Sequence, residues 1–159
     1  YKRQIMDGFA YAGEALAGRY IGARNQTALR NTVNHLFYWG IGLSAAFTLL
    51  YATGGKGFLG LLTNDISVIN ASDTYFYWAL AIPLAGFSAF LWDGVFIGAT
   101  ATRQMLYSML VASVSFFIIY YAFHNLLGNH ALWLAFITYL SLRGIVQTFI
   151  GREIVKKAI

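Results

Sequence analysis

The chain has 159 residues, of which 58% are hydrophobic and only 11% are charged, and its net charge is +5. A soluble globular domain is roughly 25% charged, so this composition excludes an ordinary soluble domain or a disordered chain and indicates a membrane protein. The chain has no cysteine, which excludes disulfide frameworks and thiol catalysis. Its basic residues are scattered along the chain between apolar runs, which argues against a nucleic-acid partner.

Stretches with few charged residues predict an all-α membrane protein with about five transmembrane helices. A span needs roughly 20 mostly apolar residues and can satisfy its own backbone groups only as a helix. The first span is short, rich in glycine and alanine and interrupted by charged residues. The predicted spans are 5–21, 32–53, 74–100, 105–126 and 131–150. Between the second and third, residues 54–71 form either a short interfacial helix or a surface loop, and residues 124–130 form the last turn.

The Lys and Arg residues at or beyond the ends of the spans are unevenly divided between the two sides of the membrane. With five spans, the loops after the first and third spans and the carboxy-terminal tail share one side, which has Arg19, Arg24, Arg30, Arg103, Arg152, Lys156 and Lys157. The other side has Lys2, Arg3 and Lys56. Because cytoplasmic loops carry the excess of basic residues, we expect a multi-pass plasma-membrane protein whose carboxy terminus is cytoplasmic.

Three segments carry distinctive combinations of residues. They are 6–24 (MDGFAYAGEALAGRYIGAR), 61–69 (LLTNDISVI) and 91–100 (LWDGVFIGAT), the last of which is followed by Arg103. In this order they resemble the eighth helix, the loop after the ninth helix and the tenth helix of multidrug and toxic compound extrusion (MATE) transporters. The tenth helix has the form typical of the DNA-damage-inducible-protein-F-like branch. The resemblance covers essentially the whole chain, as helices eight to twelve of twelve.

The resemblance implies that the chain forms most of one six-helix lobe, the carboxy-terminal one, of a two-lobed transporter. Because the chain begins at Tyr1 without an initiator methionine or a signal peptide, we expect it to be part of a longer protein. Such a protein is an antiporter and not an enzyme. It exports small organic cations or amphipathic drugs by alternating access, driven by inward flow of H⁺ or Na⁺, with no other cofactor. The branch and the absence of cysteine favour a bacterial inner membrane.

The resemblance also implies the partners of the chain. They are the lipid bilayer, the exported compound and the amino-terminal lobe, without which this chain is not expected to transport. Two other functions stay open: a lipid-linked oligosaccharide flippase of the wider superfamily and a non-transporting membrane scaffold subunit. A flippase is expected to line its cavity with basic residues, because its substrate carries pyrophosphate. The candidate cavity residues here are acidic, namely Asp7, Glu14 and Asp93.

Asp93 is the strongest candidate for a cation-coupling residue. A charged group inside a membrane costs roughly 2.5–3.5 kcal/mol on insertion scales, so it needs a partner or a function. By motif, Asp93 matches the position of a cation-site carboxylate in some branches of the family. A carboxylate shielded from water can exchange a proton or bind sodium ion together with backbone oxygens. The alternative, which we slightly favour, is a structural aspartate paired within the lobe, for example with Arg143.

The first span carries a polar stripe, because Asp7, Tyr11, Glu14 and Gly18 share one helical face. The stripe either faces the central cavity, where its carboxylates attract cations, or packs in a polar network between helices. We favour the network for Glu14 and leave both alternatives open for Asp7. Tyr11 and Phe90 are candidates for lining the cavity, where aromatic faces attract organic cations.

Other residues are candidates for structural roles. Arg143 either extends to the cytosolic interface, which we favour, or pairs with a buried carboxylate. Pro83 either kinks the third span, which we favour, or forms a hinge. Two pairs of glycines have the spacing that lets helices approach closely, and these are Gly18 with Gly22 and Gly94 with Gly98. The three histidines share no helical face, so no metal site is predicted.

Overall fold

The structure, a computed structural model, describes the backbone of residues 2–60 and 66–157 and the side chains of residues 8, 10–54 and 75–156. These residues form five helices, and the prediction of an all-α fold with about five helices is confirmed. In chain order they are α1 (Lys2–Gly22), α2 (Gln26–Gly60), α3 (Ile66–Gly98), α4 (Thr102–Leu127) and α5 (Asn129–Lys157).

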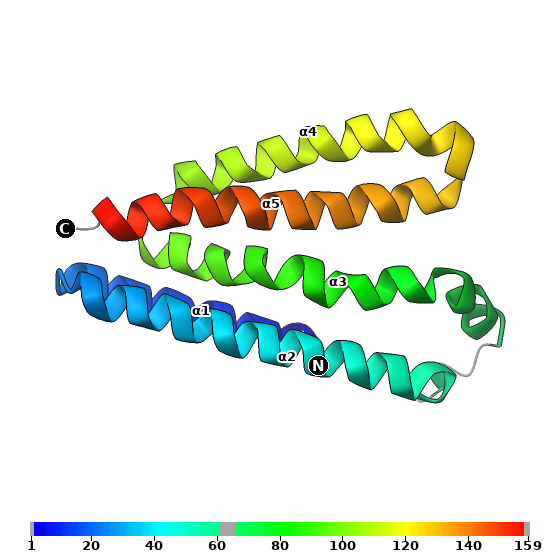
Figure 1. The fold of residues 1–159 in the computed structure, drawn as a ribbon, viewed down its shortest axis with the longest axis horizontal. Helices are drawn as coiled ribbons and strands as arrows, with labels where there is room; N and C mark the ends of the chain where they lie inside the picture. Colours follow the sequence, from blue (N-terminus) through cyan, green and yellow to red (C-terminus); the bar gives the residue numbers. More distant parts are fainter. Residues whose placement is uncertain (1, 61–65, 158–159) are drawn as a thin grey trace.

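The helices run roughly along one long axis, with α3 at the centre (Figure 1). On one side α3 packs against α1 and α2, and on the other side it packs against α5. Helix α4 packs mainly against α5 and lies at the edge of the bundle. Its large apolar side chains are therefore mostly exposed, as is expected of a surface that faces lipid.

Four of the helices are long and apolar enough to cross a membrane. These stretches are Gln26–Gly54, Tyr75–Gly98, Thr102–Leu127 and Asn129–Lys156. They correspond to the second, third, fourth and fifth predicted spans. The first predicted span lies within α1, which is not among the four and whose side chains are described only in part.

The segment 54–71 differs from both alternatives that the sequence left open. Helix α2 continues without a break to Gly60, and α3 already begins at Ile66, so most of the segment extends the two neighbouring helices. Residues 61–65 lie outside the described residues. The prediction was wrong because it ended each helix where the apolar run ends, whereas a helix satisfies its own backbone groups and continues through polar residues.

Two turns at one end of the bundle have the same geometry. Each contains one residue in the left-handed region, Arg24 with φ 50° between α1 and α2 and Thr100 with φ 53° between α3 and α4. In each turn the next residue donates its N–H to a carbonyl five residues earlier, as in the Schellman ending of a helix. These bonds join Asn25 to Tyr20 at 2.9 Å and Ala101 to Phe96 at 2.8 Å. The two hairpins therefore reverse direction in the same way.

The turn between α4 and α5 lies at the opposite end of the bundle (Figure 1). It consists of Gly128, whose φ of 54° is in the left-handed region that favours glycine. Its N–H donates to the carbonyl of His124 at 3.0 Å. The predicted turn within residues 124–130 is therefore confirmed, and it is shorter than the polar run suggested.

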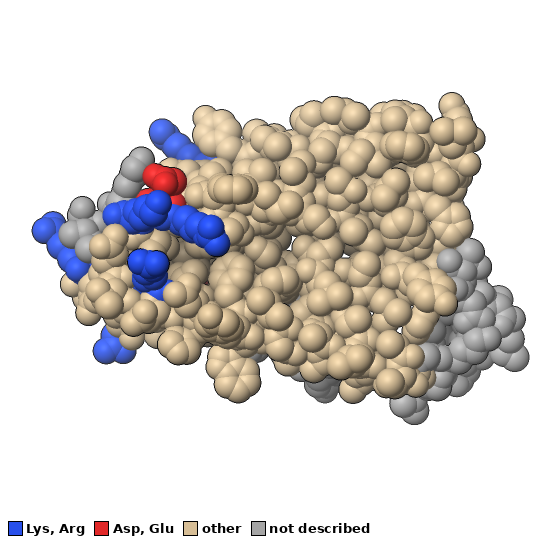
Figure 2. Space-filling model, in the orientation of Figure 1, with Lys and Arg blue, Asp and Glu red and all other residues tan. Residues whose placement is uncertain are grey.

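Charged side chains gather at the end that holds the two equivalent turns (Figure 2). The basic ones in the turns or in the adjoining helix ends are Arg19, Arg24, Arg30, Arg103, Arg152 and Lys156. The structure thus places on one end the loops and tail that the sequence assigned to one side of the membrane. Among the described Lys and Arg residues, Arg143 is the exception, because it is buried within the bundle.

Candidate functional site

The buried polar cluster between α3 and α5 is centred on Asp93. Arg143 Nη2 donates to Asp93 Oδ2 at 2.5 Å, and Gln147 Nε2 donates to Asp93 Oδ1 at 2.7 Å. Arg143 and Gln147 are four residues apart and therefore lie on one face of α5, one turn from each other. Both carboxylate oxygens have a donor, so the carboxylate is held in place by charge and by hydrogen bonds.

All three side chains of this cluster are shielded from solvent. Gln147 is fully buried, Arg143 is 8% exposed, and the side chain of Asp93 is 16% exposed. A charge-assisted bond is strong in such surroundings, because the local dielectric constant is low. The structure therefore brings together the two residues that the sequence proposed as a pair, and it adds Gln147, which the sequence reasoning missed. The available signal was a polar residue one turn after Arg143, on the same face of the helix.

The favoured interpretation of Arg143 was wrong. Its guanidinium does not extend to the interface and instead lies inside the bundle against Asp93. An arginine extends to the interface when no acceptor lies near it in the apolar region. Here a carboxylate on the neighbouring helix offers both hydrogen bonds and the opposite charge, so each group reduces the cost of burying the other.

A second set of polar contacts between α3 and α5 lies beside the Asp93 cluster. Trp92 Nε1 donates to Thr148 Oγ1 at 2.9 Å, and the hydroxyls of Ser88 and Thr148 are 3.2 Å apart. Two glycines of α5 make room for these side chains. The position of a Cβ at Gly144 would be 3.1 Å from Ser88 Cβ, and one at Gly151 would overlap the Trp92 ring. The α3–α5 contact is thus close and polar at its centre.

The opposite face of α3 packs against α1 through glycine. A Cβ at Gly94 would overlap the backbone of Ala10, and one at Gly98 would overlap the carbonyl of Glu14. Gly18 faces the backbone of Gly98, where a Cβ would be 3.4 Å from the carbonyl oxygen. The close approach of the backbones at these three positions is what the predicted packing role of the glycines requires. Gly22, the last residue of α1, has nothing within 4 Å and makes no such contact with the described residues.

The other candidate residues do not join the Asp93 cluster. The side chain of Glu14 forms no hydrogen bond or ion pair with any described residue, so the favoured packed network is not formed in the part of the chain that the structure describes. Tyr11 is 68% exposed and Phe90 is 37% exposed, each on the outside of the bundle. The side chain of Asp7 lies outside the described residues. Pro83 lies inside α3, which is helical on both sides of it.

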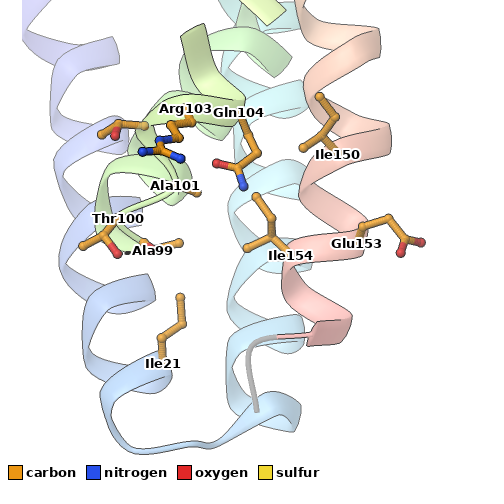
Figure 3. A pocket seen from close by; sticks show the side chains of 10 residues that line it. Ile21, Ala99, Thr100, Ala101, Arg103, Gln104, Ile150, Glu153 and Ile154 are labelled. Atoms are coloured by element: carbon orange, nitrogen blue, oxygen red, sulfur yellow. Dashed lines mark hydrogen bonds between the residues drawn. The ribbon is translucent and has the colours of Figure 1, made fainter. Parts of the chain in front are cut away.

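An open groove of about 650 Å³ lies at the end with the charged residues, away from Asp93. It is bounded by the α3–α4 turn and the last turns of α5, and Figure 3 shows its side chains. It is lined by Ile21, Ala99, Thr100, Ala101, Thr102, Arg103, Gln104, Ile150, Glu153 and Ile154. Asp93 does not line this groove.

Aromatic side chains surround His130 at the opposite end of the bundle. Trp78 Nε1 donates to His130 Nδ1 at 3.1 Å, and the ring of Tyr75 is 5.1 Å from the imidazole. Tyr75 also stacks on Trp133 and accepts a bond from Asn129 Nδ2. Such amphipathic rings are typical of the membrane interface.

Comparisons of the sequence relate the chain to known proteins. The family model described as MatE matches residues 4–122 of the chain. DNA damage-inducible protein F of Escherichia coli (strain K12) is 36% identical over 148 residues, which are 93% of this chain and 32% of that protein. The chain thus spans about a third of the length of this curated relative. No solved structure matches the chain.

Proposed function

The chain belongs to the MatE family, as its resemblance to MATE transporters indicated, and on this premise we propose that it forms most of one lobe of a membrane efflux transporter. In this proposal the five helices are helices eight to twelve of a twelve-helix protein, and spans 5–21, 32–53, 74–100, 105–126 and 131–150 cross the bilayer. The complete protein exports organic cations or amphipathic drugs in exchange for H⁺ or Na⁺, and the amino-terminal lobe supplies the rest of the cavity.

The observation that carries the proposal is the buried carboxylate of Asp93 within an apolar helix of a MatE family member. Ionisable side chains are expensive inside a membrane, and in transporters they mark the paths of ions and substrates. Asp93 is paired with Arg143 and not with an immobile backbone group, so its partner is a flexible side chain. We assign to Asp93 the binding of the coupling cation.

The charge distribution supports one orientation in the membrane. The end of the bundle with the six exposed basic residues corresponds to the cytoplasmic side, and the aromatic cluster around His130 corresponds to the outer interface. This orientation places the carboxy terminus in the cytoplasm. We propose the inner membrane of a bacterium as the location.

The experiment that tests the function uses the complete open reading frame that contains this chain. It is expressed in a bacterium that lacks its own drug-efflux systems, and the accumulation of a cationic dye is measured together with the amount of protein in the membrane. Expression is expected to lower dye accumulation. Asp93→Asn is expected to abolish this effect, because an amide can neither take up a proton nor balance the charge of a cation.

Ser108→Ala is a suitable control, because Ser108 is a buried polar residue of α4 whose one bond among the described residues is to the carbonyl of Met105 in its own helix. This variant is expected to export dye like the unmodified protein. If the unmodified protein reaches the membrane and changes neither resistance nor dye accumulation, multidrug export is the wrong function. If Asp93→Asn exports dye normally, the coupling role of Asp93 is wrong.

A further inference from the structure

Each of the two partners of Asp93 has a buried polar atom that forms no hydrogen bond with the described residues. Arg143 Nε and Gln147 Oε1 are buried and have no hydrogen-bond partner in the described part of the chain, although the other ends of both side chains bond to Asp93. Buried donors and acceptors without partners are rare in folded proteins, and each one needs an explanation. The cluster therefore contains one donor without a partner, Arg143 Nε, and one acceptor without a partner, Gln147 Oε1. Both oxygens of the Asp93 carboxylate, in contrast, accept a hydrogen bond.

The charge balance of the cluster depends on a single pair. Arg143 is the one charged group that bonds to Asp93 among the described residues. The other described charged side chains on the helices that pack against α3 form no hydrogen bond or ion pair with it, and these include Glu14, Arg19, Arg30 and Arg152. A cation that binds to Asp93 must therefore replace the guanidinium of Arg143.

We infer that Arg143 is an internal cation that occupies the Asp93 site and competes with the coupling cation for the carboxylate, while Gln147 keeps the carboxylate in place. The role in transport rests on the proposed function, but the competition itself does not. When the guanidinium leaves, Asp93 Oδ2 is free to take up a proton or, together with the unused Gln147 Oε1, to bind Na⁺, which is coordinated by oxygen. Gln147 still donates to Oδ1, so the site does not collapse.

The competition links cation binding to a change in the contact between α3 and α5. Arginine cannot lose its proton in a protein, so the displaced guanidinium keeps its charge and needs another oxygen or water. Arg143 has no second described carboxylate to bond to at its present position. Cation binding to Asp93 therefore requires Arg143 to move away from α3 or water to enter between the two helices.

The test measures how readily Asp93 reacts with N,N′-dicyclohexylcarbodiimide, which modifies protonated carboxyl groups in apolar surroundings. The complete protein is purified in detergent at pH 7, and the modified fraction of the peptide that contains residue 93 is followed by mass spectrometry. Asp93 of the unmodified protein is expected to react slowly. Arg143→Gln is expected to raise the rate at least about tenfold, because an opposite charge at bonding distance favours the ionised carboxylate by one or more powers of ten.

Two control variants separate competition from loosened packing. Arg143→Lys keeps a positive charge and is expected to restore slow modification. Thr148→Val removes the bonds of Thr148 to Trp92 and Ser88 across the same interface and leaves the Asp93 pair intact, so it is expected to react like the unmodified protein. If Arg143→Gln does not fold, Arg143→Met supplies a second neutral side chain of similar length. Addition of Na⁺ to the neutral variant is expected to slow the modification if Na⁺ is the competing cation.

Two results would overturn the inference: Asp93 reacts equally fast with and without the charge at position 143, or Thr148→Val raises the rate as much as Arg143→Gln does. The outcome is distinct from that of the transport assay. Dye export that persists in Asp93→Asn removes the coupling role and leaves the competition standing. Dye export that depends on Asp93, combined with a modification rate that does not respond to Arg143, removes the competition and leaves the proposed function standing.

Discussion

Substitution of Gly94 by alanine tests the close contact between α1 and α3. A Cβ at this position would overlap the carbonyl oxygen of Ala10 and lie 2.8 Å from its carbonyl carbon and 3.0 Å from its Cα. These atoms belong to the helix backbone, so no side-chain rotation removes the overlap and α1 must move outward as a whole. Such overpacking costs about 3 kcal/mol, at the upper end of the usual range. The better helix propensity of alanine offsets about 1 kcal/mol of this loss.

The net loss of about 2 kcal/mol corresponds to a fall in the melting temperature of about 6 °C for a chain of this size. The measurement is thermal unfolding in detergent, followed by tryptophan fluorescence because Trp92 lies in the same part of the core. Gly42→Ala is the matched control, since nothing lies within 4 Å of that position. This control is expected to leave stability unchanged or to raise it slightly. If Gly94→Ala is as stable as Gly42→Ala, the two backbones do not approach as closely as described here.

Two further substitutions test contacts that involve α5. Trp92→Phe removes the indole N–H that donates to Thr148 at 2.9 Å and is expected to lower the free energy of unfolding by about 1–2 kcal/mol. Because this substitution removes the fluorescent side chain itself, thermal unfolding is followed here by far-UV circular dichroism, and an unchanged melting temperature would contradict this prediction. Gln26→Ala removes the side-chain amide that donates to the carbonyls of Val155 and Lys156. Loss of these bonds is expected to destabilise the last turn of α5 by about 1 kcal/mol and so to speed its amide hydrogen exchange by about fivefold. Exchange in α4 serves as the internal reference, and equal protection of the last turn of α5 in both proteins would exclude this capping role.

The apolar runs were sufficient to predict the helices but not their ends. Four of the predicted spans correspond to helices that are long and apolar enough to cross a membrane, because the length of an apolar run can be counted in the sequence. Helix α2 nevertheless extends seven residues past the end of its predicted span at 53, to Gly60. The backbone hydrogen bonds of a helix do not depend on the polarity of its side chains, so hydropathy locates the apolar part and not the last residue.

The partners within the candidate site were harder to predict. The sequence identified Asp93 because a carboxylate in an apolar span is unusual, and it named Arg143 as one possible partner. The apolar residues of helix α5 are spread around the helix, so its sequence does not show which face meets α3, and the interfacial position of Arg143 was favoured over the buried one. Gln147 was missed for the same reason. The spacing of the glycines was a better guide to helix contacts. Gly94 and Gly98 lie on one face of α3, and another helix can approach closely only on that face.

The two faces of α3 differ in the kind of contact that resists displacement of the helix. Toward α1, the contact at Gly94 is backbone against backbone, with no side chain that could adopt a new rotamer during a shift. Toward α5, the contact consists of side-chain bonds from Asp93 and Thr148 that can exchange one partner for another. A shift of α3 relative to α1 therefore requires whole backbones to separate, whereas the bonds between α3 and α5 break or re-form by rotation of side chains.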